Sequence, residues 1–352
     1  MTVDAPGSVF LAEIREQPDA LRRLLEHRDE YEEVAREAVA RGPHVVRLVG
    51  HGSSDNAASY GVYAFGLEPA WTALRDSISL SVYYGADFDL RRSIVVGLSQ
   101  SGRTPDVVAY VARARKRGAF TIAVTNEHDS ELARAAEVTL PLAAGSENAV
   151  AASKTYTNQI AALLLLAAAV SGRAAQVADG IEQTASLMQD ALPDIERAVG
   201  AVASAFAYVG RMYVIGRGIE FATAREIALK LTETCRVAAE PLTSTDLAHG
   251  QIAALDPLFP VWTIASRDET LPTAIEAARR ARATGASLVA SGNAASEIEG
   301  AAYVLPVPEP PLPLLAPLLS VVPGQLFAAA LALARGLDSD HPDGLTKVTL
   351  AQ

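Results

Sequence analysis

The stretch Ser93-Ile94-Val95-Val96-Gly97-Leu98-Ser99-Gln100-Ser101-Gly102-Arg103-Thr104 decides the fold class of this chain. It opens with a short, β-branched apolar run, which predicts a strand buried on both faces. Ser99 to Thr104 then form a polar loop, and Pro105 to Arg117 has the composition of a helix. A strand, a loop and a helix in this order are the repeating unit of an α/β protein with a mostly parallel sheet.

The same alternation continues on both sides of this stretch. The residues up to about Arg41 have helical spacing, and Pro18 ends one helix or starts the next. A further helix is expected from about Asn56. The other strands predicted for the first half are 45–49, 121–124 and 138–141.

The second half of the chain repeats the first at a nearly constant offset. The matching positions lie 165 to 167 residues apart, in the pairs Gly50 and Gly216, Ser99 and Ser266, Ala119 and Ala286, and Pro141 and Pro306. Only two copies are present, so we expect twin domains and not a solenoid. The expected division is 1–195 for N-terminal helices plus a first, phosphate-binding domain, 196–337 for a second domain, and 338–352 for a C-terminal tail.

Composition excludes several classes of protein. The chain has 352 residues, enough for about two domains, and its net charge of −11 disfavours binding to a nucleic-acid backbone. Cys235 is the only cysteine, so no intrachain disulfide is possible and a reducing cytoplasm is expected. No signal-peptide pattern is present, and the apolar run Ile160–Val170 is about half a membrane span. We therefore expect a soluble, cytoplasmic protein.

The loop Ser99 to Thr104 is a candidate phosphate site. Free N–H groups and a partial positive charge gather at a helix N-terminus, and hydroxyls with a glycine complete such a site. The alternative is an ordinary turn with a serine cap. Ser53 and Ser54 follow a neighbouring strand at a comparable place, and Asn148 to Thr157 is a third polar stretch that could close the site. The second copy has Ser266-Arg267-Asp268-Glu269-Thr270 instead, without glycine and with two acids, which predicts that it has lost the site.

Three further features of the second half stand out, and the first two have an ordinary structural interpretation. Glu226, Lys230 and Glu233 lie on one face of a predicted helix, where a solvated salt-bridge face is the ordinary reading. His249 precedes a glycine, where a structural role is the ordinary reading. The terminal stretch Leu345–Leu350 is apolar for a tail, which predicts that it is docked.

Taken together, these motifs resemble a known family. Ser99-Gln100-Ser101-Gly102-x-Thr104, Ala228-Leu229-Lys230-Leu231-x-Glu233, His249-Gly250, Lys347 and the opening Glu13-Ile14-x-Glu16-Gln17-Pro18 are similar to the SIS (sugar isomerase) domain family. They resemble the isomerase half of glucosamine-6-phosphate synthase and the related glucosamine-6-phosphate deaminases. The resemblance implies two tandem SIS domains, each a mostly parallel five-stranded sheet flanked by helices.

The resemblance also implies roles for individual residues. Glu233 would be the base that moves a proton between C1 and C2 of a sugar phosphate, and Lys230 would position it or the substrate. His249 would help to open the sugar ring from the neighbouring subunit, which implies a homodimer. Lys347, on a tail that covers the site, would touch the carbonyl end of the open sugar. No metal or organic cofactor is implied. The residues expected to hold the sugar phosphate are Ser54, Ser99, Gln100, Ser101, Thr104, Val150 and Ser153.

Departures from the family pattern bear on the substrate. Ala152-Ser153-Lys154 stands in place of Ser-Thr-Lys, Gln251 in place of proline, and Asp246 in place of glutamate. The chain also begins with Met1 and has no room for a glutaminase domain, which favours a catabolic direction. We expect conversion of glucosamine 6-phosphate to fructose 6-phosphate and ammonia. The alternatives are a lyase that removes the C2 proton and the C3 hydroxyl of N-acetylglucosamine 6-phosphate, and a non-catalytic sugar-phosphate sensor.

Overall fold

The computed structural model describes residues 5–347, which form two compact units. The N-terminal unit comprises Asp19–Glu147 and Lys154–Glu182. The C-terminal unit comprises the chain up to Pro18, Asn148–Ser153 and Gln183–Lys347. Each unit is therefore assembled from separate stretches of the sequence. The domain limits expected at residues 195 and 337 stay predictions.

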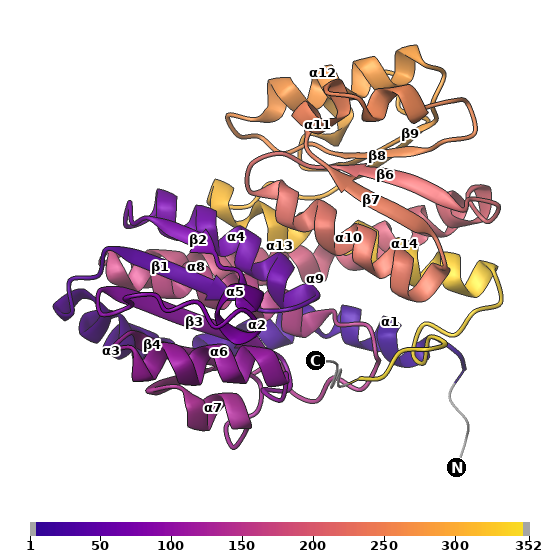
Figure 1. Cartoon of the computed structure of the whole chain (residues 1–352). Helices are drawn as coiled ribbons and strands as arrows, with labels where there is room; N and C mark the ends of the chain where they lie inside the picture. Colours follow the sequence, from indigo (N-terminus) through magenta and orange to yellow (C-terminus); the bar gives the residue numbers. More distant parts are fainter. Residues whose placement is uncertain (1–4, 348–352) are drawn as a thin grey trace. The chain divides into compact units, whose positions relative to one another are not determined.

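The N-terminal unit is built on a five-stranded parallel sheet. Its strands are β1 (Val45–Val49), β2 (Ala73–Arg75), β3 (Ser93–Ser99), β4 (Phe120–Thr125) and β5 (Val138–Pro141). They pair in the order β2-β1-β3-β4-β5, and every pairing is parallel (Figure 1). Every residue of β3 and β4 is buried, as expected for central strands covered on both faces.

Helices cover both faces of this sheet. They are α2 (Gln17–Leu25), α3 (Arg28–Ala40), α4 (Ser53–Leu67), α5 (Ile78–Val82), α6 (Pro105–Lys116), α7 (Glu131–Ala135) and α8 (Lys154–Val170). On one face, α3 and α4 pack against α8, which is buried from Lys154 to Ala168. On the other, α6 packs against α5 and α7 over a core that includes Val95, Val111 and Leu132.

The C-terminal unit repeats this topology. Its strands are β6 (Arg211–Ile215), β7 (Ala238–Leu242), β8 (Val261–Ile264), β9 (Leu288–Gly292) and β10 (Tyr303–Pro306). They are all parallel, in the order β10-β9-β8-β6-β7. Counted from the first strand of each copy, the two orders are the same. The predicted α/β fold with two five-stranded sheets is therefore confirmed.

The helices of the second sheet follow the same plan. They are α10 (Glu220–Cys235), α11 (Ser244–Ala248), α12 (Leu271–Ala283), α13 (Ala316–Ser320) and α14 (Val322–Ala334), with 3-10 turns η1 (Gln251–Ala254), η2 (Ala295–Glu297) and η3 (Pro313–Leu315). α10 packs closely on α14, since a Cβ added at Gly324 would lie 2.3 Å from Ile227. α11 and α12 contact each other, and α12 also contacts β8 and β9.

The elements that escape the sequence analysis include two strands and a long helix. β2 and β7 are short edge strands, and β7 contains Pro241, which an edge strand tolerates because its N–H is not needed there. The long helix is α9 (Ala174–Ala205), which has 32 residues and continues through Pro193. Its residues up to Glu182 belong to the N-terminal unit and the rest to the C-terminal unit.

Hydrogen bonds connect residues near the two described ends of the chain within the C-terminal unit. α1 (Ser8–Arg15) begins where the carboxylate of Asp340 accepts hydrogen bonds from the backbone N–H groups of Phe10, at 2.7 Å, and Val9, at 3.1 Å. Asp340 is almost completely buried. Of the docked tail predicted at Leu345–Leu350, residues 348–350 lie outside the described part of the chain.

One apolar stretch resembles a membrane span in length and composition. It is Pro313–Ala334, and 89% of its most apolar window is buried inside the fold. It comprises η3, α13 and α14, and α14 packs against α10 and α1. Burial of this kind is what a core helix shows, and such a stretch is weak evidence for a membrane span.

Candidate functional site

The loop between β3 and α6 holds its hydroxyl groups close together. The Oγ of Ser99 lies 3.1 Å from Oγ1 of Thr104 and also accepts a hydrogen bond from the N–H of Gly102 at 3.1 Å. The Oγ of Ser101 accepts from the N–H of Arg103 at 3.3 Å. Thr104 is the N-cap residue of α6, but its side chain makes no capping bond to the helix. The loop thus gathers hydroxyls at the N-terminus of a twelve-residue helix, where an anion is stabilised.

Gly102 is required for the shape of this loop. Its φ of +62° is a conformation that side chains other than glycine rarely adopt. A Cβ at this position would lie 2.1 Å from Oγ of Ser130, so a larger residue would displace the loop. The glycine therefore lets the backbone turn and approach its neighbours closely.

Ser54 lies at the same edge of the sheet. It is the second residue of α4, which follows β1, the strand adjacent to β3. Its buried Oγ accepts a hydrogen bond of 3.0 Å from Nε2 of Gln159, on α8. Five predicted phosphate-binding residues thus follow two neighbouring strands of one sheet: Ser54, Ser99, Gln100, Ser101 and Thr104.

A histidine and an aspartate beside this loop were missed by the sequence analysis. Nε2 of His51 lies 2.6 Å from Oδ2 of Asp106. Asp106 is in the first turn of α6 and its side chain is 10% exposed, whereas that of His51 is 54% exposed. The two residues are 55 positions apart in sequence, so only the fold brings them together.

The second copy has a buried carboxyl group at the position that corresponds to Ser54 of the predicted phosphate site. Glu220 stands where the duplication places the counterpart of Ser54, and Ser266 is the counterpart of Ser99. The Oγ of Ser266 donates a hydrogen bond of 2.5 Å to Oε1 of Glu220. Burial raises the pKa of Glu220, because removal from water disfavours the charged form. This carboxyl group fills the position that a ligand would need, which supports the predicted loss of the site.

Lys230 and two glutamates form a buried cluster on α10. Nζ of Lys230 lies 2.6 Å from Oε2 of Glu233 and 3.4 Å from Oε1 of Glu226. The side chains of Lys230 and Glu226 have no exposed surface, whereas that of Glu233 is 23% exposed. A solvated salt-bridge face is therefore wrong for these residues. The arrangement fixes one carboxylate oxygen of Glu233 and leaves part of the group accessible.

Glu233 lines a cavity of about 410 Å³ within the C-terminal unit. The cavity lies between the end of α10 and the segment Leu337–Leu345. Arg236, which ends α10 with a φ of +53°, forms an ion pair with Asp343 across it. A partly exposed carboxylate beside a cavity is an arrangement that suits a general base.

The segment Asn148–Ser153 is held in the same unit. The carboxylate of Glu13 accepts from the N–H of Asn148 at 2.5 Å, and the N–H of Val150 donates to the backbone oxygen of Asp340 at 3.0 Å. Nζ of Lys347 donates to the backbone oxygen of Ala149 at 2.7 Å. Val150, a predicted substrate residue, is thus in one hydrogen-bonded region with Lys347. Ser153, at the end of the same segment, is buried.

His249 stands apart from these groups. It ends α11, is exposed, and its ring makes no hydrogen bond to any residue between 5 and 347. The preceding helix begins with a capping box, in which Thr243 and Asp246 exchange hydrogen bonds. Those bonds lower the pKa of Asp246. Asp246, a departure from the family pattern, therefore serves the start of this helix.

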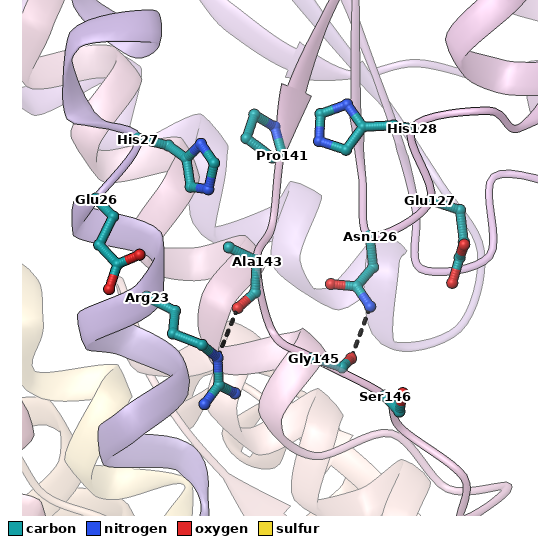
Figure 2. Close-up of a pocket in the computed structure, with 10 residues that line it drawn as sticks. All are labelled: Arg23, Glu26, His27, Asn126, Glu127, His128, Pro141, Ala143, Gly145 and Ser146. Carbon is teal, nitrogen blue, oxygen red and sulfur yellow. Dashed lines mark hydrogen bonds between the residues drawn. The ribbon is translucent and has the colours of Figure 1, made fainter.

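A second cavity, of about 460 Å³, lies in the N-terminal unit and contains none of the predicted site residues. Figure 2 shows it between the end of α2 and the loops after β4 and β5, with the rings of His27 and His128 on either side of Pro141. Arg23 donates to the backbone oxygens of Ala143, at 3.1 Å, and Ala144, at 2.8 Å. The described residues hold no group of three His, Cys, Asp or Glu side chains that could bind a metal ion.

Comparison with known proteins agrees with this architecture. The SIS domain family matches residues 90–169 and 206–335. A glutamine–fructose-6-phosphate aminotransferase (isomerizing) of Aeropyrum pernix is 34% identical over 97% of this chain and 57% of its own length. The chain thus spans little more than half of such curated relatives.

Two solved structures match this chain over nearly the whole length of both chains. A protein of Silicibacter pomeroyi DSS-3, named provisionally as a phosphosugar isomerase, is 31% identical, with a TM-score of 0.83 over 94% of this chain and 99% of that one. The glucosamine-6-phosphate deaminase of Thermotoga maritima has a TM-score of 0.77 over 98% and 100% of the two chains. At 20% identity, that second likeness concerns the fold alone.

Proposed function

Because this chain belongs to the SIS domain family, whose relatives here are of the phosphosugar isomerase type, we propose that it converts glucosamine 6-phosphate and water to fructose 6-phosphate and ammonia. The observation that carries this proposal is Glu233, held by a buried lysine 2.6 Å away and partly exposed beside a cavity. A sugar-phosphate sensor would need a phosphate site but not a carboxylate prepared in this way.

The proposed reaction is a proton transfer followed by hydrolysis. In the open-chain sugar, Glu233 takes the proton from C2, and the electron pair of that bond forms the C1–C2 double bond of an enolamine. The π electrons of the C1 carbonyl move to its oxygen, which takes up a proton from water, and the nitrogen gives a proton back to water when the imine forms. Return of the proton to C1 leaves an imine at C2. Water adds to the imine carbon, the C2–N bond breaks, and ammonia leaves as fructose 6-phosphate forms. Lys230 keeps the carboxylate oriented throughout.

We also propose that the β3–α6 loop binds a phosphate group. Ser99, Ser101 and Thr104 offer hydroxyl donors there, at the N-terminus of α6. Binding at the phosphate supplies energy remote from the reacting carbons and restricts the sugar chain. The roles proposed for Gln100, Ser54, Val150 and Ser153 follow the family pattern.

Replacement of Glu233 by glutamine tests the proposal directly. Glutamine keeps the shape and removes the base, so kcat should fall by at least about a hundredfold while the sugar phosphate still binds. Exchange of the C2 proton with deuterated water, followed by NMR, should slow in parallel. If Glu233→Gln exchanged this proton at the wild-type rate, another group would be the base.

The lyase reading has one observation in its favour. Ala152 and Gln251 replace residues of the family pattern, so groups near the sugar ring have changed. The same base would remove the C2 proton of N-acetylglucosamine 6-phosphate, and hydroxide would leave from C3. NMR of products from hexose, hexosamine and N-acetylhexosamine 6-phosphates separates the reactions, since an unsaturated sugar would replace fructose 6-phosphate and ammonia.

We further propose a cytoplasmic homodimer in which His249 acts on the partner's substrate. The exposure of His249 supports this, because a group that serves another subunit must reach the surface of its own. Glu233→Gln and His249→Ala proteins should each be nearly inactive, and mixing them with subunit exchange should restore activity. A monomer in light scattering, or exchange without restoration, would show that His249 serves its own chain.

A further inference from the structure

His51 and Asp106 form a hydrogen-bonded pair beside the phosphate loop that the proposed reaction does not use. The parallel register of β1 and β3 places them there. Val49 pairs with Gly97, so His51, two residues beyond Val49, follows β1 at the level where Ser99 begins the loop. Asp106 comes two residues after Thr104, the N-cap of α6. The pair therefore lies at the same edge of the sheet as the loop.

The charge balance of this edge calls for a cation. The side chains expected to bind the phosphate are hydroxyls and one amide, all uncharged. The carboxylate of Asp106 adds a negative charge in the first turn of α6, where its Oδ1 also contacts the N–H of Val107 at 3.0 Å. The whole chain carries a net charge of −11. A phosphate dianion would therefore meet repulsion here unless a positive group compensated for it. Arg103, exposed on the loop, and His51 are two groups of this edge that can carry a positive charge.

The hydrogen bonding of His51 determines how it can meet an anion. Asp106 is an acceptor, so Nε2 of His51 carries a proton and donates to it. The other ring nitrogen, Nδ1, makes no hydrogen bond to the residues of the described part of the chain. With Nε2 protonated, Nδ1 can donate to an anion only when the ring is a cation. Binding of an anion at Nδ1 and a positive charge on His51 therefore occur together.

We propose that His51, positioned by Asp106, is a further phosphate-binding residue and supplies positive charge to the site. The inference rests on the proposed function, since it concerns the phosphate group of that substrate. The exposure of the ring leaves it accessible to a ligand, and the buried carboxylate limits its rotation. Asp106 acts through His51 and is a positioning residue.

Equilibrium binding of inorganic phosphate and of glucosamine 6-phosphate to the full chain, measured by calorimetry, tests this proposal. His51→Gln keeps a hydrogen-bonding side chain without charge, and affinity for both ligands should fall by about tenfold or more. His51→Lys restores a charge and should recover most of the loss. The control His128→Gln removes an exposed histidine of the loop after β4 and should leave affinity unchanged.

Asp106→Asn extends the test to the positioning residue. It should weaken phosphate binding, and His51→Gln added to it should cost much less than in the wild type, because the two residues act as one unit. Wild-type affinity in His51→Gln, or equal loss in His51→Gln and His51→Lys, would overturn the inference and leave the proposed reaction standing. Failure of the wild type to bind either ligand would instead count against the proposed substrate class.

Discussion

Replacing Lys230 by methionine should destabilise the C-terminal unit strongly. Methionine preserves most of the volume of the lysine stem but removes the cation that contacts Glu226 and Glu233. Glu226 has no exposed surface, so its carboxylate would be left buried without its cationic partner. Removing one member of a buried ion pair costs about 3–5 kcal/mol, whereas Glu233 is partly exposed and can be hydrated.

The loss of stability in Lys230→Met can be measured by calorimetry and by urea unfolding. For a folding unit of this size, about 1 kcal/mol corresponds to roughly 2–4 °C in Tm, so the transition should fall by roughly 6–20 °C. The double variant Lys230→Met/Glu226→Leu also removes the negative charge of Glu226 and should recover at least half of the lost stability.

An exposed ion pair provides the matched control. Arg197 and Asp194 lie three residues apart on α9, with side chains 76% and 80% exposed. Arg197→Met should cost less than about 1 kcal/mol, because water and salt screen exposed pairs. If Lys230→Met cost no more than Arg197→Met, or if the double variant were as unstable as the single one, the account of a buried cluster would be wrong.

Three other variants test separate features. Gly102→Ala should reduce phosphate affinity by about tenfold or more and lower Tm, whereas Gly200→Ala, with no atoms near the added Cβ, should be neutral or stabilising. Glu220→Gln should become more stable relative to the wild type in urea unfolding as pH rises above the ordinary pKa of a glutamate. The reason is that a pKa raised by burial provides stability at low pH that is lost as the group ionises. A constant difference would refute this. Asp340→Ala should cost about 1–2 kcal/mol and speed hydrogen exchange in α1, and unchanged exchange there would disprove its capping role.

The sequence pattern predicts the central parts of the fold better than the edges. Strands such as β3 and β4 are continuous apolar runs because helices cover both faces, and this signal is local. The edge strands β2 and β7 have few buried positions and carry no such signal. The helix α9 is not predicted from the sequence, and it contains Pro193, a residue that usually ends or kinks a helix.

The candidate site also contains some residues that the sequence predicts and others that only the fold brings together. Spacing placed Glu226, Lys230 and Glu233 on one helix face, but spacing cannot distinguish a buried face from a solvated one. His51 and Asp106 meet only through the parallel register of two strands, so no local pattern reveals them. The duplication could have revealed Glu220, because it occupies the position that matches Ser54.

The link between Asp340 and the start of α1 constrains the order in which the chain can fold during synthesis. Once residue 182 has left the ribosome, both stretches of the N-terminal unit are available. The first helix, although made earliest, must wait for a carboxylate more than 300 residues later. We therefore expect nascent chains to show a protected N-terminal unit while Phe10 and Ile14, both buried in the finished protein, are still open to solvent or to a chaperone.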